Sequence, residues 1–585
     1  MKRIAMPFNI ILLLVSLLSA FGLDARQLTS ADLPEGLNEY IGISPSEEIY
    51  LHIDRDKYIA GEDIWFSIYT TDRETGKLSA RSAIAYIELL NPWNMPVIQE
   101  RFKLSGGKGE GNFLLPDSIS SGTYTIRAYT YWMKNFLPDN CFTYDVEIYN
   151  PFKGPDFWWK VGTGDSSDMK LITSPDKGWS TVSLRVDTIF ERRESVTLKI
   201  GPDKNNTDEA GNAEMSISVT PAEVSADFKG TNDYSFFGTE PKQYRFESEG
   251  HYLSVKVKYR EDNVSDSSDF LYMSIQGKVA EFNYAVRDTA GCYTFILPID
   301  NKSRNLILQP EHANNNMILE IEPSFSWILP SSHSFKETFT DSQIDLFSEL
   351  SFNYQAAKIY GTILKKEAET VDNSNQTKRR FYGIPEMEIF LDDYIKLPSM
   401  QEVFFELLPG VNLRTRKSEY EIKITNPLTG ESYEEPPLVM IDGVIINNLM
   451  VLVDLNPELV EKVEVVKTPY LIGDLILHGI VNVITRSGDF SNINMPEYAV
   501  ILPYRVVEKA STFISPDYSD KQQKLSRKPD LRNTLYWNPS VKTNMNGEAL
   551  VEFWTSDLPG LYTINIQGIS DNGKKISVNK SFRIR

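Results

Sequence analysis

Cysteine and histidine are scarce in this chain of 585 residues, which contains two cysteines and five histidines. Cys141 and Cys292 lie far apart, so a disulfide is possible but nothing in their spacing favours one, and we expect two buried thiols. The histidines are scattered without the spacing of metal ligands, and we expect His52 to be structural. The sequence therefore predicts no metal site and no bound cofactor.

Recognisable catalytic motifs are also missing. The sequence contains no nucleophile elbow and no phosphate-binding loop. Acidic pairs such as Asp392-Asp393 lack the spacing of an EF-hand calcium loop and are expected to be solvated. We therefore predict no catalytic residues and a protein that is not an enzyme. A glycan- or peptide-cleaving activity in a sandwich groove stays open as an alternative that no residue supports.

Positive charge is in deficit, since 60 Lys and Arg face 80 Asp and Glu and the net charge is −20. Such an acidic chain is repelled by phosphate backbones. We therefore expect no nucleic-acid partner, and the simplest role of the acidic excess is solubility.

Long apolar runs are absent after the first residues. Lys2 and Arg3 precede an apolar run over residues 10–18, and small residues follow it. This order predicts a secretory signal peptide at residues 1–22 and an exported mature chain. A transmembrane helix needs about 20 apolar residues, and no later segment reaches that length. No cysteine stands near the cleavage region, so a lipid anchor is not expected.

What the sequence does contain is a strand pattern. Aromatic residues make up 12% of the chain, which favours strands, and the length predicts several domains. Ile64, Phe66 and Ile68 alternate with polar residues, and similar runs recur between turn residues. Short strands divided by turns are typical of antiparallel sandwiches. We expect a mainly β chain of tandem sandwiches, the first over residues 44–150.

Residues 50–66 carry an Asp-Arg pair, a tyrosine and then Gly-Glu ahead of an apolar strand. These motif residues are Asp54, Arg55, Tyr58, Gly61 and Glu62. The segment resembles the opening of the second macroglobulin-type domain of alpha-macroglobulins. Residues 121–128 resemble a late strand of the same domain. The resemblance implies a macroglobulin-like or immunoglobulin-like β-sandwich in which the five motif residues are structural.

Further units follow along the chain. We expect a second sandwich over 159–232 and a third over 234–325, which resembles the small regulatory sandwich found ahead of many outer-membrane receptors. Residues 530–585 are expected to form a separate macroglobulin-like β unit. Between these, residues 340–380 are expected to hold an amphipathic helix and a polar linker, with Ser342 as a plausible N-cap.

Residues 383–488 show a mixed α and β pattern. Ser399 and Glu402 have the form of a capping box, and Asn456 is placed to cap a second short helix. Apolar strands follow these turns, and the Asp442-Gly443 pair is a strong turn signal. We therefore expect one small α+β domain among the sandwiches.

Five segments of this region stand in the order of a known family: 407–411, 437–444, 456–467, Gly473 and 479–486. Through them the region resembles the plug domain of TonB-dependent outer-membrane receptors. The candidate interaction surface that the resemblance implies comprises Pro409, Gly410, Asp442, Gly443, Glu464, Lys467, Gly479 and Asn482. Without the resemblance, the Asp442-Gly443 pair is simply a turn, and Glu464 and Lys467 are the polar face of a strand.

Two features of these families are missing. A receptor barrel of some 22 strands needs about 220 residues before any loop, and only 97 residues follow position 488. The thioester of protease-trapping macroglobulins needs Cys-Gly-Glu-Gln, and neither Cys141 nor Cys292 fits. We therefore expect no transport barrel in this chain and no covalent trapping of proteases.

The expected function is protein–protein interaction in the cell envelope of a Gram-negative bacterium, in the periplasm or at the outer membrane. The macroglobulin-like sandwiches would act as spacers, and the plug-like domain would bind an envelope protein. The alternative is an accessory role in TonB-dependent nutrient uptake, in which the plug-like domain pairs with a barrel or a TonB-type protein on another chain. A TonB box is not evident near the mature N-terminus, and its absence weakens this alternative.

Overall fold

The structure is a computed structural model, and it describes twelve stretches of the chain. They are residues 46–153, 179–180, 182–202, 212–226, 244–260, 269–312, 316–330, 339–362, 365–367, 379–416, 419–490 and 495–585. The expected signal peptide and most of the expected linker lie outside these residues. The described chain is mainly β, built from tandem antiparallel sandwiches, as the strand pattern predicted.

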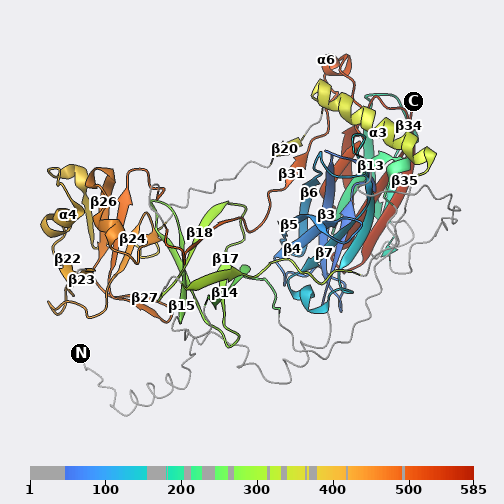
Figure 1. The fold of residues 1–585 in the computed structure, drawn as a ribbon. Coiled ribbons are helices and arrows are strands. Elements are labelled where there is room, and N and C mark those ends of the chain that lie inside the picture. The colour runs from blue at the N-terminus through green and yellow to red at the C-terminus, as the bar shows by residue number, and fades with distance from the viewer. Residues whose placement is uncertain are drawn as a thin grey trace, which may run out of the picture.

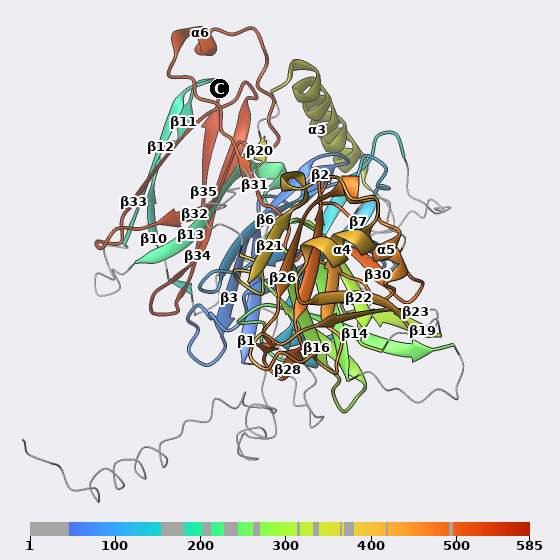
Figure 2. The same ribbon diagram turned by 90° about the vertical axis from the view of Figure 1, so that its left-hand side faces the viewer.

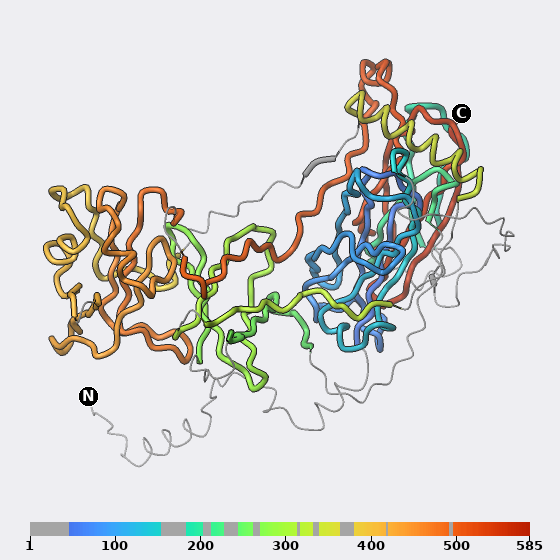
Figure 3. Tube along the Cα trace, viewed as in Figure 1, coloured from blue at the N-terminus to red at the C-terminus, as the bar shows by residue number. Residues whose placement is uncertain are grey.

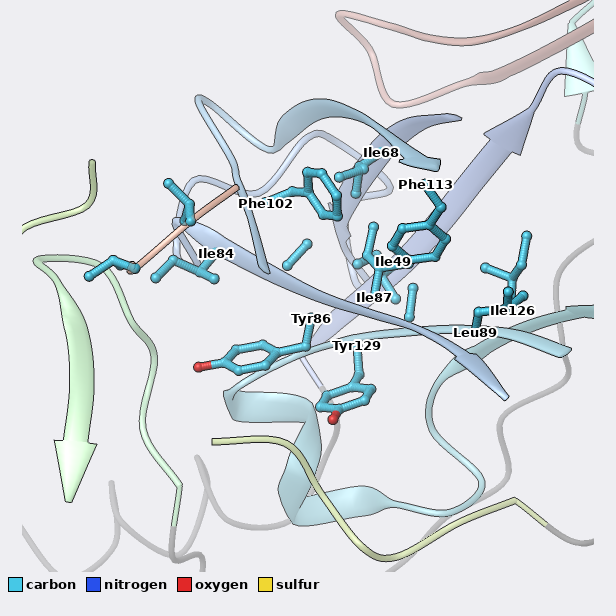
Figure 4. Packing of buried hydrophobic residues seen from close by; sticks show 14 of the residues in the cluster. Ile49, Ile68, Ile84, Tyr86, Ile87, Leu89, Phe102, Phe113, Ile126 and Tyr129 are labelled. Atoms are coloured by element: carbon cyan, nitrogen blue, oxygen red, sulfur yellow. The ribbon is translucent and has the colours of Figure 1, made fainter. Parts of the chain in front are cut away.

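The first sandwich pairs a three-stranded sheet, β1-β3-β6, with a five-stranded sheet, β2-β8-β7-β4-β5. Its strands are β1 (Glu47–Ile53), β2 (Lys57–Ile59), β3 (Asp63–Asp72), β4 (Ile84–Leu90), β5 (Pro96–Lys103), β6 (Lys108–Leu114), β7 (Gly122–Thr130) and β8 (Phe142–Tyr149). Figure 4 shows Ile49, Ile87 and Phe113 of its core together, and Tyr86 and Tyr129 stacked beside them with ring centroids 5.6 Å apart. Alternating apolar residues on both sheets therefore close one continuous core.

The second sandwich is assembled from two distant parts of the chain. Strands from residues 179–221 are β9 (Trp179–Ser180), β10 (Val182–Arg185), β11 (Ile189–Phe190), β12 (Ser195–Pro202) and β13 (Ala213–Pro221). Strands from residues 536–584 are β32 (Tyr536–Lys542), β33 (Ala549–Trp554), β34 (Gly560–Ser570) and β35 (Lys575–Ile584). The sheets are β10-β12-β33 and β11-β35-β34-β13-β32, with β9 beside β35.

This assembly corrects the expected domain division. The proposed second sandwich at 159–232 and the proposed C-terminal unit at 530–585 are two halves of one domain. The physical reason is edge pairing. Without the C-terminal strands, β12 and β13 expose hydrogen-bonding edges that β33, β32 and β34 satisfy in the folded chain.

The third sandwich also borrows a later strand. Its sheets are β17-β14-β19 and β16-β15-β18-β30, built from β14 (His251–Tyr259), β15 (Phe270–Ile275), β16 (Glu281–Val286), β17 (Cys292–Leu297), β18 (Arg304–Pro310), β19 (Met317–Ile321) and β30 (Val500–Tyr504). β30 follows the α+β unit in sequence and returns to pair with β18. In sequence, the α+β unit therefore lies between β19 and β30 of this sandwich, and its C-terminal end leads into β30.

The α+β unit, residues 381–490, has a five-stranded sheet in the order β21-β26-β29-β24-β25. Its strands are β21 (Met387–Phe390), β22 (Val411–Arg416), β23 (Glu419–Ile424), β24 (Leu438–Ile441), β25 (Val444–Ile445), β26 (Val460–Val466), β27 (Tyr470–Ile472), β28 (Leu475–Leu477) and β29 (Ile480–Thr485). Its helical segments are η4 (Leu391–Asp393), α4 (Met400–Leu407), α5 (Met450–Val453) and η5 (Pro457–Leu459). Ser399 and Asn456 cap α4 and η5 through their side chains, as predicted.

Helix α3 (Asp341–Tyr360) is capped two residues earlier than expected. Its N-cap is Thr340 rather than Ser342, because Thr340 exchanges capping hydrogen bonds with Gln343 three positions later. After α3 the chain forms β20 (Lys365–Glu367), which pairs with β31 (Ser511–Phe513) on the returning segment. The strand that leads from α3 toward the α+β unit therefore lies beside the strand that returns from it.

The units follow one another along the molecule. Figures 1 and 3 show the α+β unit at one end, the third sandwich next to it, and the first two sandwiches at the other end with α3 across their top. Figure 2 shows the second sandwich beside the first, and α6 (Lys521–Lys524) projecting above both. In the described part of the chain, no helix is long and apolar enough to cross a membrane.

Candidate functional site

The Asp-Arg and Gly-Glu motif forms a buried polar cluster at one end of the first sandwich. Tyr58 donates a hydrogen bond to Asp54 Oδ1 at 2.8 Å, and Arg55 Nη2 contacts Glu62 Oε2 at 2.8 Å. The backbone N–H of Ile59 donates to the same Glu62 oxygen at 2.7 Å. Burial raises the pKa of the Asp54 carboxyl, and the adjacent guanidinium of Arg55 limits that rise. All four side chains are buried, so the motif acts inside the protein.

The same cluster holds three distant segments together. Thr534 donates to Asp54 Oδ2 at 2.6 Å, and Asn533 Nδ2 donates to Glu62 Oε1 at 2.7 Å. Asn533 also donates to the backbone carbonyl of Leu350 in α3, at 3.0 Å. The motif of the first sandwich therefore fixes both α3 and the segment that leads into β32.

Gly61 completes this junction. Its φ is +90°, a backbone conformation that residues with a Cβ rarely adopt. A Cβ at this position would lie 2.4 Å from Asp117 Oδ1 and 2.8 Å from Tyr354 Oη. Tyr354 donates to the Gly61 carbonyl at 2.6 Å. Glycine is required here because the helix tyrosine sits directly against the turn.

A cavity of about 610 Å³ opens beside this junction. Its apolar wall includes Trp65, Leu115 and Phe513, and acidic groups stand at Asp63 and Asp117. Lys358 lies 3.8 Å from Asp117, so the exposed charges at the mouth are partly balanced. The cavity has the size of a small-molecule site. Each buried ionic group in its wall is already paired within the protein.

His52 lies at the interface of the first and second sandwiches. Its Nδ1 is 2.5 Å from Ser216 Oγ, and Tyr69 donates to the same hydroxyl at 2.9 Å. Burial lowers the pKa of His52 to about 3, so the ring is neutral at physiological pH. Histidine and serine are both fully buried, and the pair has a structural role.

The two cysteines lie in different sandwiches and are both free thiols. Cys141 is buried, as expected, but Cys292 is only half-buried at the start of β17. Burial raises the pKa of the Cys141 thiol to about 11, which keeps it protonated and unreactive.

In the α+β unit, the Asp442-Gly443 pair forms the predicted turn, with φ values of +48° and +76°. The Asp442 carboxylate is fully buried and accepts hydrogen bonds from Thr485 and from the backbone N–H of Phe490. Gly443 packs against the third sandwich, where a Cβ would lie 3.2 Å from the Ile275 carbonyl. The turn is therefore a joint between two units and not an exposed contact surface.

Glu464 is also buried, at 1% exposure, and is not the polar face of a strand. Its carboxylate pairs with Arg380 at 2.5 Å and Lys462 at 2.8 Å, and it accepts from Tyr382 at 2.6 Å. The fully buried Asn482 donates to the same tyrosine oxygen at 3.0 Å. These residues form one internal network, because residues 380–382 cover this part of the sheet.

The remaining plug-motif residues lie at or near two other turns, one between α4 and β22 and one between β28 and β29. Gly410 has a φ of +84°, and the Lys467 ammonium approaches it. Gly479 has a φ of +95°, and a Cβ there would lie 2.6 Å from Ile424 Cδ1. Pro409 is exposed. The eight motif residues are thus divided between the joint, the internal network and these turns, and they do not form one surface.

An exposed groove of about 350 Å³ lies elsewhere on the α+β unit, and the sequence reasoning missed it. Its apolar lining comprises Leu391, Ile395, Leu397, Val403, Leu407 and Pro457. Ile395 is 82% exposed at its rim. The signal was present in the sequence as apolar residues among charged ones, but periodicity does not show which of them a loop leaves uncovered.

Ion pairs border this groove. Arg486 makes two hydrogen bonds to Asp392, at 2.6 and 2.9 Å, and these lower the pKa of the Asp392 carboxyl. Lys396 Nζ lies 3.0 Å from Glu458 Oε1. Residues 381–490 contain 18 acidic and 8 basic residues, a net charge of −10, which is half of the chain's −20. The groove is therefore an apolar depression on a strongly acidic unit.

Comparison with known proteins gives a limited result. No family model matches the chain, and no curated protein matches it. A trypsin-activated alpha-2-macroglobulin from Escherichia coli aligns at 9% identity and a TM-score of 0.23, covering 92% of this chain and 41% of that one. A Salmonella alpha-2-macroglobulin reacted with methylamine aligns at 10% identity and a TM-score of 0.24, with 92% and 39% covered.

Latent PorU from Porphyromonas gingivalis aligns at 9% identity and a TM-score of 0.14, with 92% and 34% covered. The chain thus spans about two fifths of the length of these macroglobulins. The plug resemblance of residues 383–488 receives no support from these comparisons. Bacterial alpha-2-macroglobulins are among the structural neighbours of this mainly β chain, at a similarity too low to carry its function.

Proposed function

We propose that this is an exported, non-enzymatic protein of the bacterial cell envelope that binds a partner protein through the groove of its α+β unit. The observation that carries the proposal is the apolar groove lined by Ile395, Leu397 and Leu407 on the unit that lies farthest from the first two sandwiches. Exposed apolar depressions framed by polar residues are typical of binding surfaces.

The rest of the unit suits such a role. An apolar interface joins it to the third sandwich, through residues that include Tyr272, Ala280, Met440 and Leu475. The backbone N–H of Gly277 donates to the Asp442 carbonyl at 2.9 Å across the same joint. The groove is therefore presented on a firmly attached support, and a partner meets it in one orientation.

The acidic charge of the unit defines the partner's chemistry. A net charge of −10 over residues 381–490 attracts a basic surface and speeds its approach. Aliphatic side chains of the partner would fill the groove, and its Lys and Arg residues would face the surrounding carboxylates. The transport alternative is a special case of this proposal, in which the partner is an outer-membrane barrel; the sandwich directly ahead of the α+β unit favours it.

Photo-crosslinking tests the proposal. A photoreactive amino acid replaces Ile395 in the full-length chain in intact cells, and the matched control replaces Met545, which is 90% exposed on the second sandwich. We expect one discrete crosslinked protein from position 395 and none from position 545. The same bands from both positions, or none from position 395, would overturn the proposal.

A second variant measures the groove's contribution. Burying one isoleucine side chain contributes about 1.5–3 kcal/mol, so Ile395→Ser is expected to weaken binding of the crosslinked partner roughly tenfold to a hundredfold. The purified variant should unfold at the same denaturant concentration as the wild type because the side chain is exposed. Unchanged affinity with intact folding would contradict the assignment of the groove.

A further inference from the structure

The segment 517–528, the basic loop, projects at the opposite end of the molecule from the α+β unit (Figure 1). It contains the short helix α6, and its cations are Lys521, Lys524, Arg527 and Lys528, all exposed. Leu525 stands among them at 70% exposure. In a chain with a net charge of −20, this loop carries four basic and two acidic residues, a net charge of +2.

The loop is held rigidly from beneath by one buried arginine. Arg193 donates to the backbone carbonyls of Gln523, Lys524, Ser526 and Lys528 at distances of 2.6 to 3.2 Å. The same guanidinium makes two hydrogen bonds to Asp557, at 2.6 and 2.8 Å. These hydrogen bonds of Arg193, the arginine clamp, fix the backbone of the loop. Little conformational entropy is therefore lost when the loop binds a partner.

The side chains that the clamp displays are not neutralised internally. Across the described ranges, no ion pair involves the four cations, whereas the nearby Arg193 and Arg532 are paired with Asp557 and Asp530. The arginines that build the loop are thus buried and satisfied, and the lysines and arginine on its outside face solvent. Arg193 and Arg532 therefore have a structural role, and the four exposed cations are free to bind an external anionic surface.

We propose that the basic loop contacts the anionic phospholipid surface of a membrane. The four cations lie against lipid phosphates, and Leu525 enters the headgroup region between them. Charge and an exposed apolar side chain are the two signals that surface-binding segments combine. The acidic remainder of the chain is repelled by the same surface, which orients the molecule with the loop toward the membrane.

The size of the effect follows from the number of charges. Each Lys or Arg near an anionic bilayer strengthens binding about fivefold, so four contribute on the order of a hundredfold to a thousandfold. This attraction is screened by salt, because the Debye length falls from about 10 Å at 0.1 M to about 3 Å at 1 M. A chain bound mainly through the loop should therefore leave the membrane at high salt.

Vesicle flotation of the full-length protein tests the proposal. The probes are vesicles of phosphatidylcholine alone and of phosphatidylcholine mixed with phosphatidylglycerol. We expect flotation only with the anionic vesicles, reversed by about 1 M salt, and lost in the variant K521Q/K524Q/R527Q/K528Q. Leu525→Ser is expected to weaken flotation severalfold while leaving its salt dependence unchanged.

The matched control removes four exposed cations elsewhere, in the variant K77Q/K103Q/K199Q/R583Q, which changes the net charge equally. It should float like the wild type. Equal loss in both variants would show that net charge and not the loop decides, and would overturn the proposal. Failure of the wild type to float would also overturn it.

Discussion

The substitution Glu62→Gln tests the buried junction most directly. The Glu62 carboxylate accepts from Arg55 and the Ile59 N–H through one oxygen, and from Asn533 through the other. A glutamine has one carbonyl oxygen, so its amide nitrogen must face either these two donors or the Asn533 donor. At least one buried donor therefore loses its acceptor in either orientation.

The expected magnitude follows from these contacts. Arg55 is 2% exposed, and its remaining contacts would be the Asp54 carboxylate, 3.5 Å from its Nε, and the neutral Lys57 carbonyl, 3.0 Å from its Nη1. Removing one partner of a buried ion pair costs about 3–5 kcal/mol, and an unsatisfied buried donor costs about 1–3 kcal/mol. Because glutamine preserves the shape of the side chain, we expect a loss of about 3–5 kcal/mol in unfolding free energy rather than the sum of both.

The assay is urea unfolding of the full chain, combined with hydrogen exchange at the backbone amides of residues 55–65 and 533–536. The control is Glu48→Gln, the same chemical change at a more accessible pair, in which Glu48 lies 3.5 Å from Lys575. We expect Glu48→Gln to lower the unfolding free energy by less than about 1 kcal/mol. Equal effects of the two substitutions, or protection of residues 533–536 unchanged in Glu62→Gln, would refute the reasoning.

Three further predictions concern other parts of the structure. Burial lowers the pKa of His52 from 6.5 to about 3, so its neutral form stabilises the fold above pH 6.5 and this contribution is lost as pH falls toward 3. Between pH 7 and pH 5 we expect the unfolding free energy of the wild type to fall by about 2 kcal/mol more than that of His52→Gln, measured by urea unfolding at each pH. Gly61→Ala should cost more than about 2 kcal/mol, whereas Gly106→Ala, also left-handed but with open space around it, should cost about 1 kcal/mol. Arg193→Lys should speed tryptic cleavage of the basic loop at least tenfold, and the exposed Arg192→Lys should not change it; similar cleavage rates in both would contradict the clamp.

The strand pattern was sufficient to predict the fold class, and local rules predicted the caps of α4 and η5 and the turn at Asp442-Gly443. These features depend on residues a few positions apart, and a linear sequence displays them directly. The set of strands that forms the second sandwich was not predictable in this way. Strand β13 looks the same whether its partners follow at once or lie 300 or more residues later, as β32 and β34 do.

The candidate site was only partly predictable, for a related reason. Glu464 alternates with apolar neighbours and so reads as a solvent-facing residue, but Arg380 and Tyr382 from another segment cover it. The motif around Asp54 and Glu62 was identified as structural, yet its partners at positions 533 and 534 had no local signal. Sequence patterns showed which residues are polar but not which segment would lie on top of them.

The divided second sandwich also sets the order in which the chain can fold. Strands β12 and β13 are synthesised long before β32 to β35. Until those last strands arrive, the earlier half presents open edges that invite pairing with other chains. The third sandwich and the α+β unit must close their own cores in the meantime, while their two connections to the second sandwich are still unanchored. A chain truncated before β35 would thus have an incomplete second sandwich, with unpaired edges in its early strands as well as in its late ones. Folding of this early part of the chain therefore depends on intact C-terminal strands.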